Sequence, residues 1–267
     1  MVKRIIAAIP ALALLVLVVY FHGLYAKIVV AAAGLICMHE MMNVVAKDDA
    51  RPIRAVGYLF AALAYPAYEF WAFTGIMALY ALCMMAVFIV LIITDKDLKA
   101  AFMTVFVLLY PGLFLVFLIA VVCVPVAQTA RFLMIIAFGA AAVTDTFAYF
   151  SGRLFGKRKL AERISPKKTV GGAVGGTVFG TCAVYLLGLF VQGAFGVGIS
   201  PYWYFLLGLT LSVLTQFGDL SASIIKRKFG VKDYGKIMGE HGGAMDRLDS
   251  VLFICPAVFA FYCIIAP

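Results

Sequence analysis

The sequence predicts an all-α polytopic integral membrane protein, and three observations lead to this fold class. The chain is 65% hydrophobic and only 13% charged, whereas soluble domains carry about 25% charged residues. Its mean hydropathy is +1.07. Apolar segments of near-membrane length recur along the whole chain and alternate with short polar loops. A chain this apolar cannot hide its surface from water, so we expect a lipid bilayer around it.

We expect nine transmembrane helices, because about 20 apolar residues are needed to cross the bilayer. The charged start Met1–Arg4 and the apolar run after it are similar to a secretory signal peptide, but further spans follow at once, so we interpret the run as the first helix. The third span is short, and Pro66 with Glu69 favours a kink or re-entrant bend there. The expected spans are 5–23, 28–46, 55–70, 72–94, 102–125, 131–150, 173–195, 202–222 and 250–266.

The uneven distribution of Lys and Arg predicts the orientation, since cytoplasmic loops carry the excess of positive charge. With nine spans and a cytoplasmic N-terminus, 20 of the 22 Lys and Arg lie inside, and only Lys27 and Arg131 lie outside. The first loop (151–170) and the second loop (223–249) then both face the cytoplasm, where nucleotides are. We therefore predict a cytoplasmic N-terminus and a C-terminus outside.

The same pattern excludes other classes of protein. The net charge of +9 sits in loops between spans, which indicates membrane topology and no nucleic-acid partner. The six cysteines lie in apolar runs without metal-ligand spacing, so we interpret them as small hydrophobic residues. The predicted organisation is an N-terminal region of about five spans (1–130) and a C-terminal catalytic region (131–267) that carries both loops.

Acidic residues within membrane spans are costly and are therefore candidates for function. Asp145 lies in the span before the first loop, and Asp219 lies directly before the second loop. Asp246 and Asp249 are three residues apart, so they share one face of a helix. The carboxylates of Asp219, Asp246 and Asp249 would repel one another at one membrane face unless a cation lies between them. Mg²⁺ is the expected cation, because it binds one or two carboxylates together with phosphate oxygens. The alternative is that Asp246 and Asp249 only charge the start of the last helix.

Other polar or small residues in the spans are expected to have structural roles. We interpret Glu40 and Glu69 as buried hydrogen-bond anchors. Gly172, Gly176 and Gly180 are spaced by four, which favours close packing of the seventh span against another helix. The alternative is that the glycines before this helix let backbone N–H groups approach an anion.

Basic residues in both loops are candidates for binding phosphate. In the first loop, Lys167 and Lys168 follow Ser165, and the alternative is that they set the topology and attract lipid headgroups. In the second loop, basic residues alternate with acids, a histidine and a glycine pair, which is unusual for a loop that only carries inside-positive charge. The candidates there are Lys226, Arg227, Lys232, His241, Gly242, Gly243 and Arg247.

The second loop resembles the signature of the phosphatidate cytidylyltransferases, also called CDP-diacylglycerol synthases. The family pattern begins with a serine, a Lys-Arg pair and a Lys-Asp pair, and ends with His-Gly-Gly and Asp-Arg-hydrophobic-Asp. In this sequence it reads Ser223, Lys226-Arg227, Lys232-Asp233, Gly235, Met238-Gly239, His241-Gly242-Gly243 and Asp246-Arg247-Leu248-Asp249. Nearly every fixed position matches over some 27 residues, so a match by chance is negligible.

A second block, from Asp145 to Thr169, resembles the segment that precedes the family's glycine pair. It contains Gly152-Arg153, Gly156-Lys157 and Ser165-Pro166-Lys167-Lys168-Thr169. The sequence departs from the family at Gly171, where a glutamate is usual. The resemblance covers roughly residues 140–266.

The resemblance implies transfer of the cytidylyl group of CTP to phosphatidic acid, giving CDP-diacylglycerol and pyrophosphate, by a homodimeric enzyme in the lipid bilayer of the bacterial inner membrane. We then expect Mg²⁺, held by Asp219, Asp246 and Asp249, with room for a second cation. Lys226 and Arg227 would act in catalysis. The remaining expected contacts to substrate phosphate or nucleotide are Asp145, Ser165, Lys167, Lys168, Lys232, His241, Gly242, Gly243 and Arg247.

Two other functions stay open from the sequence. A CTP-dependent polyprenol or phytol kinase would use similar motifs but would transfer the γ-phosphate to an alcohol, and the His-Gly-Gly and Asp-Arg-x-Asp patterns favour the cytidylyltransferase. An ion-coupled transporter or lipid flippase would place its acids near the midplane of the bilayer, whereas here the best candidates cluster at one rim.

Overall fold

The computed structural model describes residues 16–21, 23–48, 51–95, 97–195, 199–237, 239 and 242–265. Seven helices within these residues are long and apolar enough to span a membrane, which confirms a polytopic helical membrane protein. The expected count of nine is wrong for this part of the chain. The predicted first span, 5–23, lies mostly outside the described residues, and the predicted spans 55–70 and 72–94 form one helix, α3 (Arg54–Thr94), with a sharp bend inside it.

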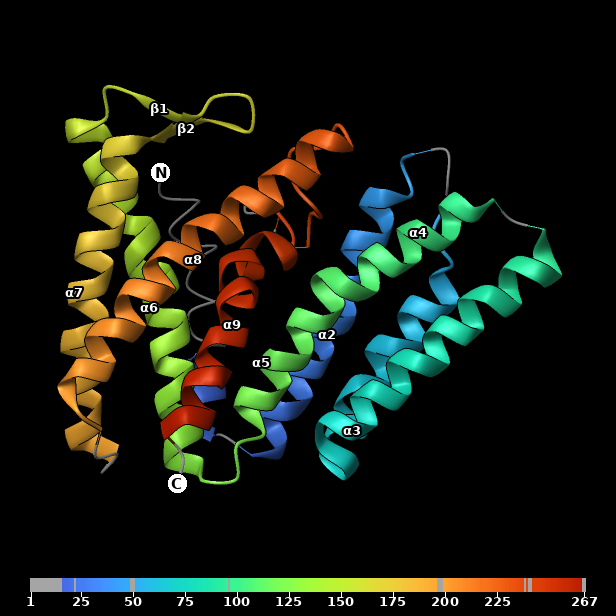
Figure 1. The fold of residues 1–267 in the computed structure, drawn as a ribbon, viewed down its shortest axis with the longest axis horizontal. Coiled ribbons are helices and arrows are strands. Elements are labelled where there is room, and N and C mark those ends of the chain that lie inside the picture. Colours follow the sequence, from blue (N-terminus) through green and yellow to red (C-terminus); the bar gives the residue numbers. More distant parts are fainter. Residues whose placement is uncertain are drawn as a thin grey trace. The chain divides into compact units, whose positions relative to one another are not determined.

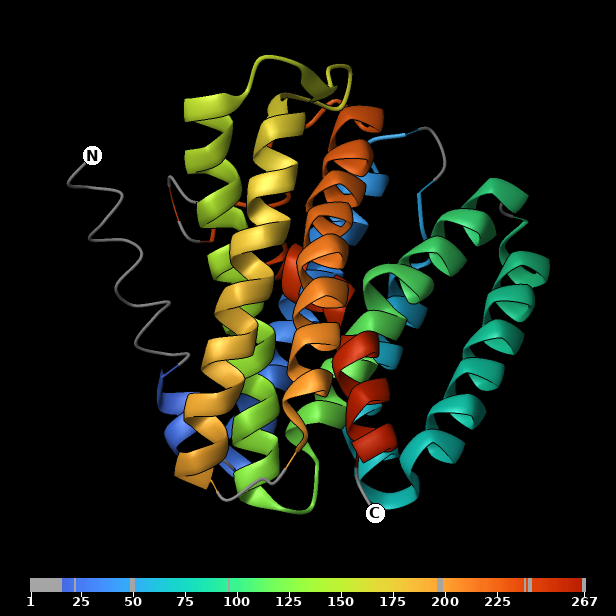
Figure 2. The same ribbon diagram turned by 60° about the vertical axis from the view of Figure 1, so that its left-hand side comes forward.

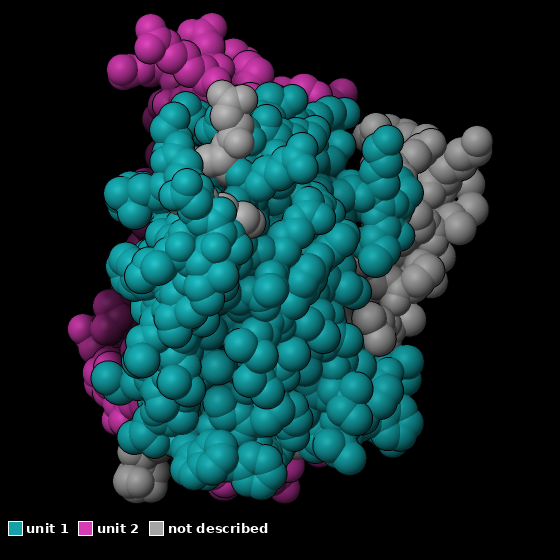
Figure 3. All heavy atoms as spheres, turned by 90° about the vertical axis from the view of Figure 1, so that its right-hand side faces the viewer, with its two compact units in different colours: residues 1–123, 228–248 teal, residues 124–227, 249–267 magenta. Residues whose placement is uncertain are grey.

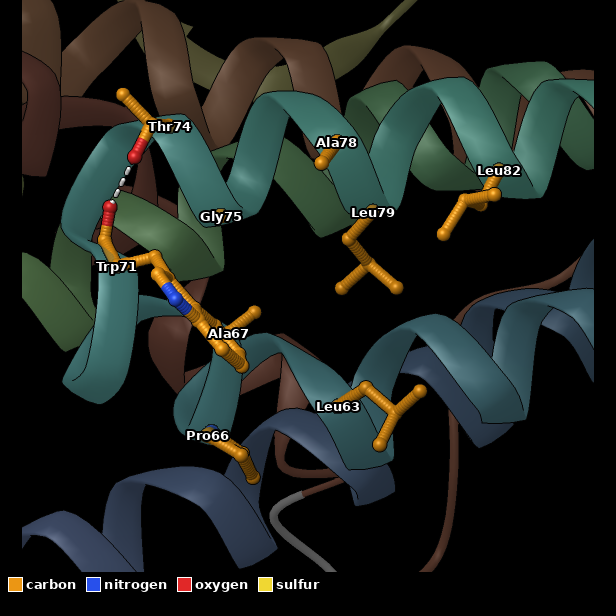
Figure 4. Close-up of a pocket in the computed structure, with 9 residues that line it drawn as sticks. All are labelled: Leu63, Pro66, Ala67, Trp71, Thr74, Gly75, Ala78, Leu79 and Leu82. Atoms are coloured by element: carbon orange, nitrogen blue, oxygen red, sulfur yellow. Dashed lines mark hydrogen bonds between the residues drawn. The ribbon is translucent and has the colours of Figure 1, made fainter.

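The bend of α3 lies at Ala72, whose backbone leaves the helical region with φ 48° and ψ −139°. The two arms of α3 therefore turn back on each other (Figures 1 and 4). Thr74 Oγ1 donates a hydrogen bond to the Trp71 carbonyl at 2.5 Å in the turn. Leu63 of the first arm and Leu79 of the second line an apolar cavity of about 470 Å³ (Figure 4). The predicted break between the two segments was thus placed correctly, although the second arm does not count as a separate helix.

Glu69, near the turn of α3, is exposed and not buried as expected. Its carboxylate accepts two hydrogen bonds from Lys27 Nζ, at 2.6 and 2.8 Å. Lys27 lies in the first turn of α2 (Leu24–Val45), so the ion pair joins α2 to α3. Glu69 is therefore a hydrogen-bond anchor, as predicted, but one at the surface of the protein.

The chain divides into two compact units (Figure 3). The first unit comprises residues 1–123 and 228–248, and the second comprises residues 124–227 and 249–267. Besides α2 and α3, the first unit contains a long interrupted span. Asp97 caps the start of this span by accepting a hydrogen bond from Lys99 N at 3.1 Å. Its parts are α4 (Leu98–Val107), the π-helical turn η1 (Leu108–Leu113) and α5 (Phe114–Val122).

The second unit is built on α6 (Ala127–Phe155), α7 (Val170–Phe195) and α8 (Pro201–Lys228), and includes most of α9 (Met245–Ile265). The first loop is not irregular. It contains a short antiparallel hairpin of β1 (Lys159–Ala161) and β2 (Ser165–Thr169) at the end of α6 and α7 (Figures 1 and 2). The sequence did not predict these strands, because only a few residues pair.

Small residues bring α6 and α7 together, and the two helices run side by side in both ribbon views (Figures 1 and 2). A Cβ atom on Gly172 would lie 2.6 Å from the Ala148 carbonyl oxygen, one on Gly176 2.8 Å from Ala148 Cβ, and one on Gly180 2.4 Å from Thr144 Oγ1. The packing role predicted for these glycines is confirmed. Gly172 N, in addition, donates to Thr169 Oγ1 at 3.1 Å, so this first-turn amide is already satisfied within the protein.

We expect Gly176→Ala to destabilise the protein by about 1–3 kcal/mol, the usual cost of overpacking a close contact. The matched control is Gly193→Ala in the same helix, because a Cβ atom there meets nothing within 4 Å. Thermal unfolding of the purified protein in detergent measures both. Equal melting temperatures for the two variants would contradict the packing role of Gly176.

Candidate active site

A polar cavity of about 490 Å³ lies in the second unit, between α6, the β-hairpin, α7 and α8. Its lining brings together residues of the first sequence block, which runs from Asp145 to Thr169, and an acid of α8 that precedes the second loop. From the first come Asp145 and the hairpin residues Ser165, Lys167 and Lys168, and from α8 comes Asp219. Five predicted site residues that are up to 74 positions apart in the chain therefore line one cavity.

An ion pair in this cavity joins the hairpin to α8. Lys168 Nζ lies 2.7 Å from Asp219 Oδ2, and both side chains are partly exposed. Lys168 Nζ also lies 3.5 Å from the Gln216 carbonyl oxygen, and Ser223 donates to Asp219 Oδ1 at 3.4 Å. The side chain of Gln216 in turn bonds α7, since its Nε2 donates to Thr177 Oγ1 at 3.0 Å. Lys168 of the hairpin is thus held against Asp219 in the C-terminal half of α8.

Asp249 lies near the same acids but is buried, with 8% of its surface exposed. It interacts electrostatically with Asp219 and with Asp145, and the nearby Lys226 offsets part of this repulsion. Ser250 Oγ donates to Asp145 Oδ2 at 3.5 Å, so α9 is tied to α6. The structure therefore groups Asp145 with Asp219 and Asp249. From the sequence, Asp145 was predicted to contact substrate; its position in a membrane span was the signal that it belongs with the acids.

Asp246 makes its described hydrogen bonds within the second loop, in the first unit. Its Oδ2 accepts from Tyr234 N at 2.7 Å and from Gly243 N at 2.9 Å. Gly242 has φ +81°, a conformation that favours glycine, and a Cβ atom there would lie 2.7 Å from Asp246 Oδ2. Asp246 therefore shapes the Gly242–Gly243 turn. Its predicted role as a metal ligand stays a prediction.

Glu40 confirms its predicted role as a buried hydrogen-bond anchor. It lies in α2 with 4% of its surface exposed. Its carboxylate accepts hydrogen bonds from Ala244 N at 3.1 Å and Met245 N at 2.8 Å. These amides open α9, so a side chain some 200 residues away in sequence caps this helix.

The remaining predicted site residues are placed less specifically. Arg227 Nε donates to the Ile164 carbonyl in the hairpin turn at 3.4 Å, which supports the hairpin from α8. Lys232 and Arg247 are exposed in the first unit. His241 lies outside the described residues. Their predicted contacts to substrate stay predictions.

The donor set fits the chemistry of Mg²⁺. Asp145, Asp219 and Asp249 are oxygen donors that repel one another, and this hard cation prefers carboxylate oxygens. Within the described ranges, no three His, Cys, Asp or Glu side chains form a ready-made ligand group. Mg²⁺ usually binds to one or two carboxylates and completes its shell with water and substrate phosphates, so a fully preformed cage is not required.

A sequence profile of the cytidylyltransferase family matches residues 2–265 of the chain. The chain therefore belongs to the cytidylyltransferase family, a family of enzymes, as the resemblance of its two polar loops predicted. The chain is similar to proteins named phosphatidate cytidylyltransferase. It is 39% identical to that of Aquifex aeolicus over 167 residues, which cover 62% of this chain and 59% of the relative.

Two other relatives give the same pattern. The phosphatidate cytidylyltransferase of Thermotoga maritima is 34% identical over 176 residues, 64% of each chain. That of Bacillus subtilis is 46% identical over 117 residues, 43% of this chain and 42% of the relative. The matched segments thus span less than two thirds of these relatives.

Proposed function

We propose that the protein transfers the cytidylyl group of CTP to phosphatidic acid. The observation that carries this proposal is the polar cavity in which Lys167, Lys168 and Asp219 lie together at the end of membrane helices. Both proposed substrates are anionic phosphates, so cations and a bound Mg²⁺ are needed to bring them together. Membership of the cytidylyltransferase family, and the names of the relatives, support the choice of substrates.

An apolar groove beside the cavity supports a lipid substrate. It has a volume of about 530 Å³ and lies between α7 and α8 beneath the hairpin. Leu160, Ala173 and Gln216 line both the groove and the polar cavity. Apolar side chains such as Val174, Val178 and Phe217 make up the rest of its wall. A phosphate in the cavity and acyl chains in the groove would match this division, with the lipid entering sideways from the bilayer.

In the proposed reaction, a phosphate oxygen of phosphatidic acid attacks the α-phosphorus of CTP. The new P–O bond forms as the bond between the α-phosphorus and the bridging oxygen to the β-phosphate breaks, and pyrophosphate leaves with that oxygen. The lipid phosphate is already ionised, so no protein nucleophile is needed, and we predict direct transfer without a covalent enzyme intermediate. Phosphoryl-type transfer depends mainly on positioning and on charge neutralisation.

The side chains of the chain supply these two effects. Asp219 and Asp249, with Asp246 as predicted from the sequence, would hold Mg²⁺, and Asp145 adds negative charge beside them. Mg²⁺, when bound, would supply positive charge to the reacting phosphate oxygens. Lys168, at 2.7 Å from Asp219, would orient a phosphate next to the acids. The predicted roles of Lys226, Arg227 and Arg247 are to neutralise the triphosphate and the leaving pyrophosphate.

The distribution of basic residues supports an active site on the cytoplasmic side. In the second unit, the basic residues from Arg153 to Lys168 and the pair Lys226 and Arg227 lie at the hairpin end of the helices, whereas Arg131 lies near the start of α6. Positive charge marks the cytoplasmic side, where CTP is available. The homodimer implied by the resemblance stays a prediction.

The experiment that tests the function uses CTP labelled separately at the α- and γ-phosphates, with purified protein, phosphatidic acid and Mg²⁺. We expect the α label, and not the γ label, to enter the lipid fraction. Transfer of the γ label to an added polyprenol would indicate a CTP-dependent kinase. If neither label is transferred, both the cytidylyltransferase and the kinase activity are contradicted, and the result favours an ion-coupled transporter.

A further inference from the structure

We infer that Glu40 is a positioning residue for the nucleotide: from α2, it fixes the second loop in the shape that the proposed reaction requires. The inference rests on the proposed function for its substrate, and on the contacts of Glu40 for its geometry. Glu40 lies far from the second-loop signature in sequence, outside residues 140–266, over which the motif resemblance extends.

The first observation is that the carboxylate of Glu40 is buried and fully committed to the loop. One oxygen accepts from Ala244 N at 3.1 Å and the other from Met245 N at 2.8 Å. The first amides of a helix have no partner within the helix, and a negative charge is favourable there. A buried carboxylate without such partners would be very costly. Glu40 and the start of α9 therefore stabilise each other.

The second observation is that the loop glycines leave room for this carboxylate. A Cβ atom on Gly235 would lie 2.1 Å from Glu40 Oε1, and one on Gly243 would lie 2.3 Å from both carboxylate oxygens. Neither glycine has a positive φ, so backbone conformation does not explain why glycine is present at these two positions. The position of Glu40 does.

The third observation links Glu40 to the predicted nucleotide contacts. Asp246 binds Tyr234 N and Gly243 N, so two carboxylates together hold four backbone amides of the loop. Lys232 and Arg247 lie within or beside this clamped segment. Without Glu40, the start of α9 would lose two hydrogen-bond acceptors, and Lys232 and Arg247 would no longer be held in place. We therefore expect a defect in CTP binding rather than only a loss of folded protein.

The test compares Glu40→Gln, Glu40→Ala, Gly243→Ala and the double variant Glu40→Ala/Gly243→Ala in the full-length protein. We expect each of Glu40→Ala and Gly243→Ala to speed amide hydrogen exchange in peptides covering 242–250 by at least about tenfold, which corresponds to about 1.4 kcal/mol. The KM for CTP should rise about tenfold while the KM for phosphatidic acid stays unchanged. Glu40→Gln keeps the side-chain shape and one acceptor, so its effect should be smaller and the protein should still fold.

The double variant makes the test specific. If the glycine is needed only because Glu40 occupies the space, Gly243→Ala should add nothing once Glu40 is alanine. Additive effects, or unchanged loop exchange in both Glu40 variants, would overturn the inference. The matched control is Glu69→Gln, which removes a carboxylate from the same unit without contact to the loop; it should leave loop exchange and the KM for CTP as in the wild type.

The two proposals fail in different ways. If the wild-type protein transfers no cytidylyl group, the proposed function is wrong, yet the exchange data and the double variant still decide whether Glu40 fixes the loop. If exchange becomes faster while the KM for CTP stays unchanged, Glu40 is only structural and its role in nucleotide positioning is overturned. A general loss of folded protein would lower the apparent kcat without changing either KM, and this result would also overturn the role of Glu40 in nucleotide positioning.

Discussion

Asp219→Asn is expected to lower the rate of cytidylyl transfer by about a thousandfold or more, because the substitution removes the negative charge that pairs with Lys168 and is proposed to hold Mg²⁺. Asp219 Oδ2 pairs with Lys168 at 2.7 Å, and Asp219 Oδ1 accepts a hydrogen bond from Ser223. Asparagine has nearly the same shape but no charge. It would therefore leave Lys168 without its ion pair and would weaken the proposed binding of Mg²⁺, while the helices stay packed.

The measurement is kcat with saturating CTP and phosphatidic acid, together with the binding of Mn²⁺ as a spectroscopic probe in the absence of substrates. Melting temperature in detergent reports whether the variant is folded. Glu162→Gln is the matched control, since Glu162 is an exposed acid in the hairpin turn, and it should retain wild-type activity. Wild-type activity and wild-type Mn²⁺ affinity in Asp219→Asn would contradict the proposed role of Asp219 as a metal ligand.

Features that depend on local pattern could be predicted from the sequence. Continuous apolar runs predicted most helices, and the spacing of Gly172, Gly176 and Gly180 predicted close packing of their helix against another one, which the structure identifies as α6. The bend in α3 was predicted from the lengths of the two apolar segments together with Pro66 and Glu69. The count of spans was less secure, because a bent helix such as α3 reads in sequence as two helices. Motif resemblance predicted the family, since residues fixed by chemistry keep their spacing.

Contacts between distant side chains could not be predicted in this way. Nothing in the spacing indicates that Lys168 pairs with Asp219, or that Asp145 approaches Asp249. The same holds for Glu40, whose partners are more than 200 residues away. Such contacts follow from how whole helices pack, and a single sequence carries no record of that packing. The acids were identified as candidates only because charge is costly inside a membrane span.

The Mg²⁺ dependence of turnover separates the roles of the two acids at the start of α9. Asp249 is buried near Asp219 and Lys226, so Asp249→Asn removes one carboxylate from a group of three. We expect a severe loss of turnover that higher Mg²⁺ concentration restores in part, because the other carboxylates still attract the cation. The measurement is the Mg²⁺ dependence of kcat for this variant and for the wild type.

Asp246→Asn should also abolish turnover, but a loss of loop structure would not respond to added metal. Asp246 Oδ2 accepts from two backbone amides, and an asparagine that turns its amide nitrogen toward them could accept from neither. If Asp246 acts mainly through the loop, excess Mg²⁺ leaves its variant inactive and amide exchange in the loop becomes faster. If Asp246 is a metal ligand, as the sequence predicts, its variant should follow that of Asp249 and gain activity with Mg²⁺. The comparison of the two variants therefore shows, for each acid, whether it binds the cation or stabilises the fold of the second loop.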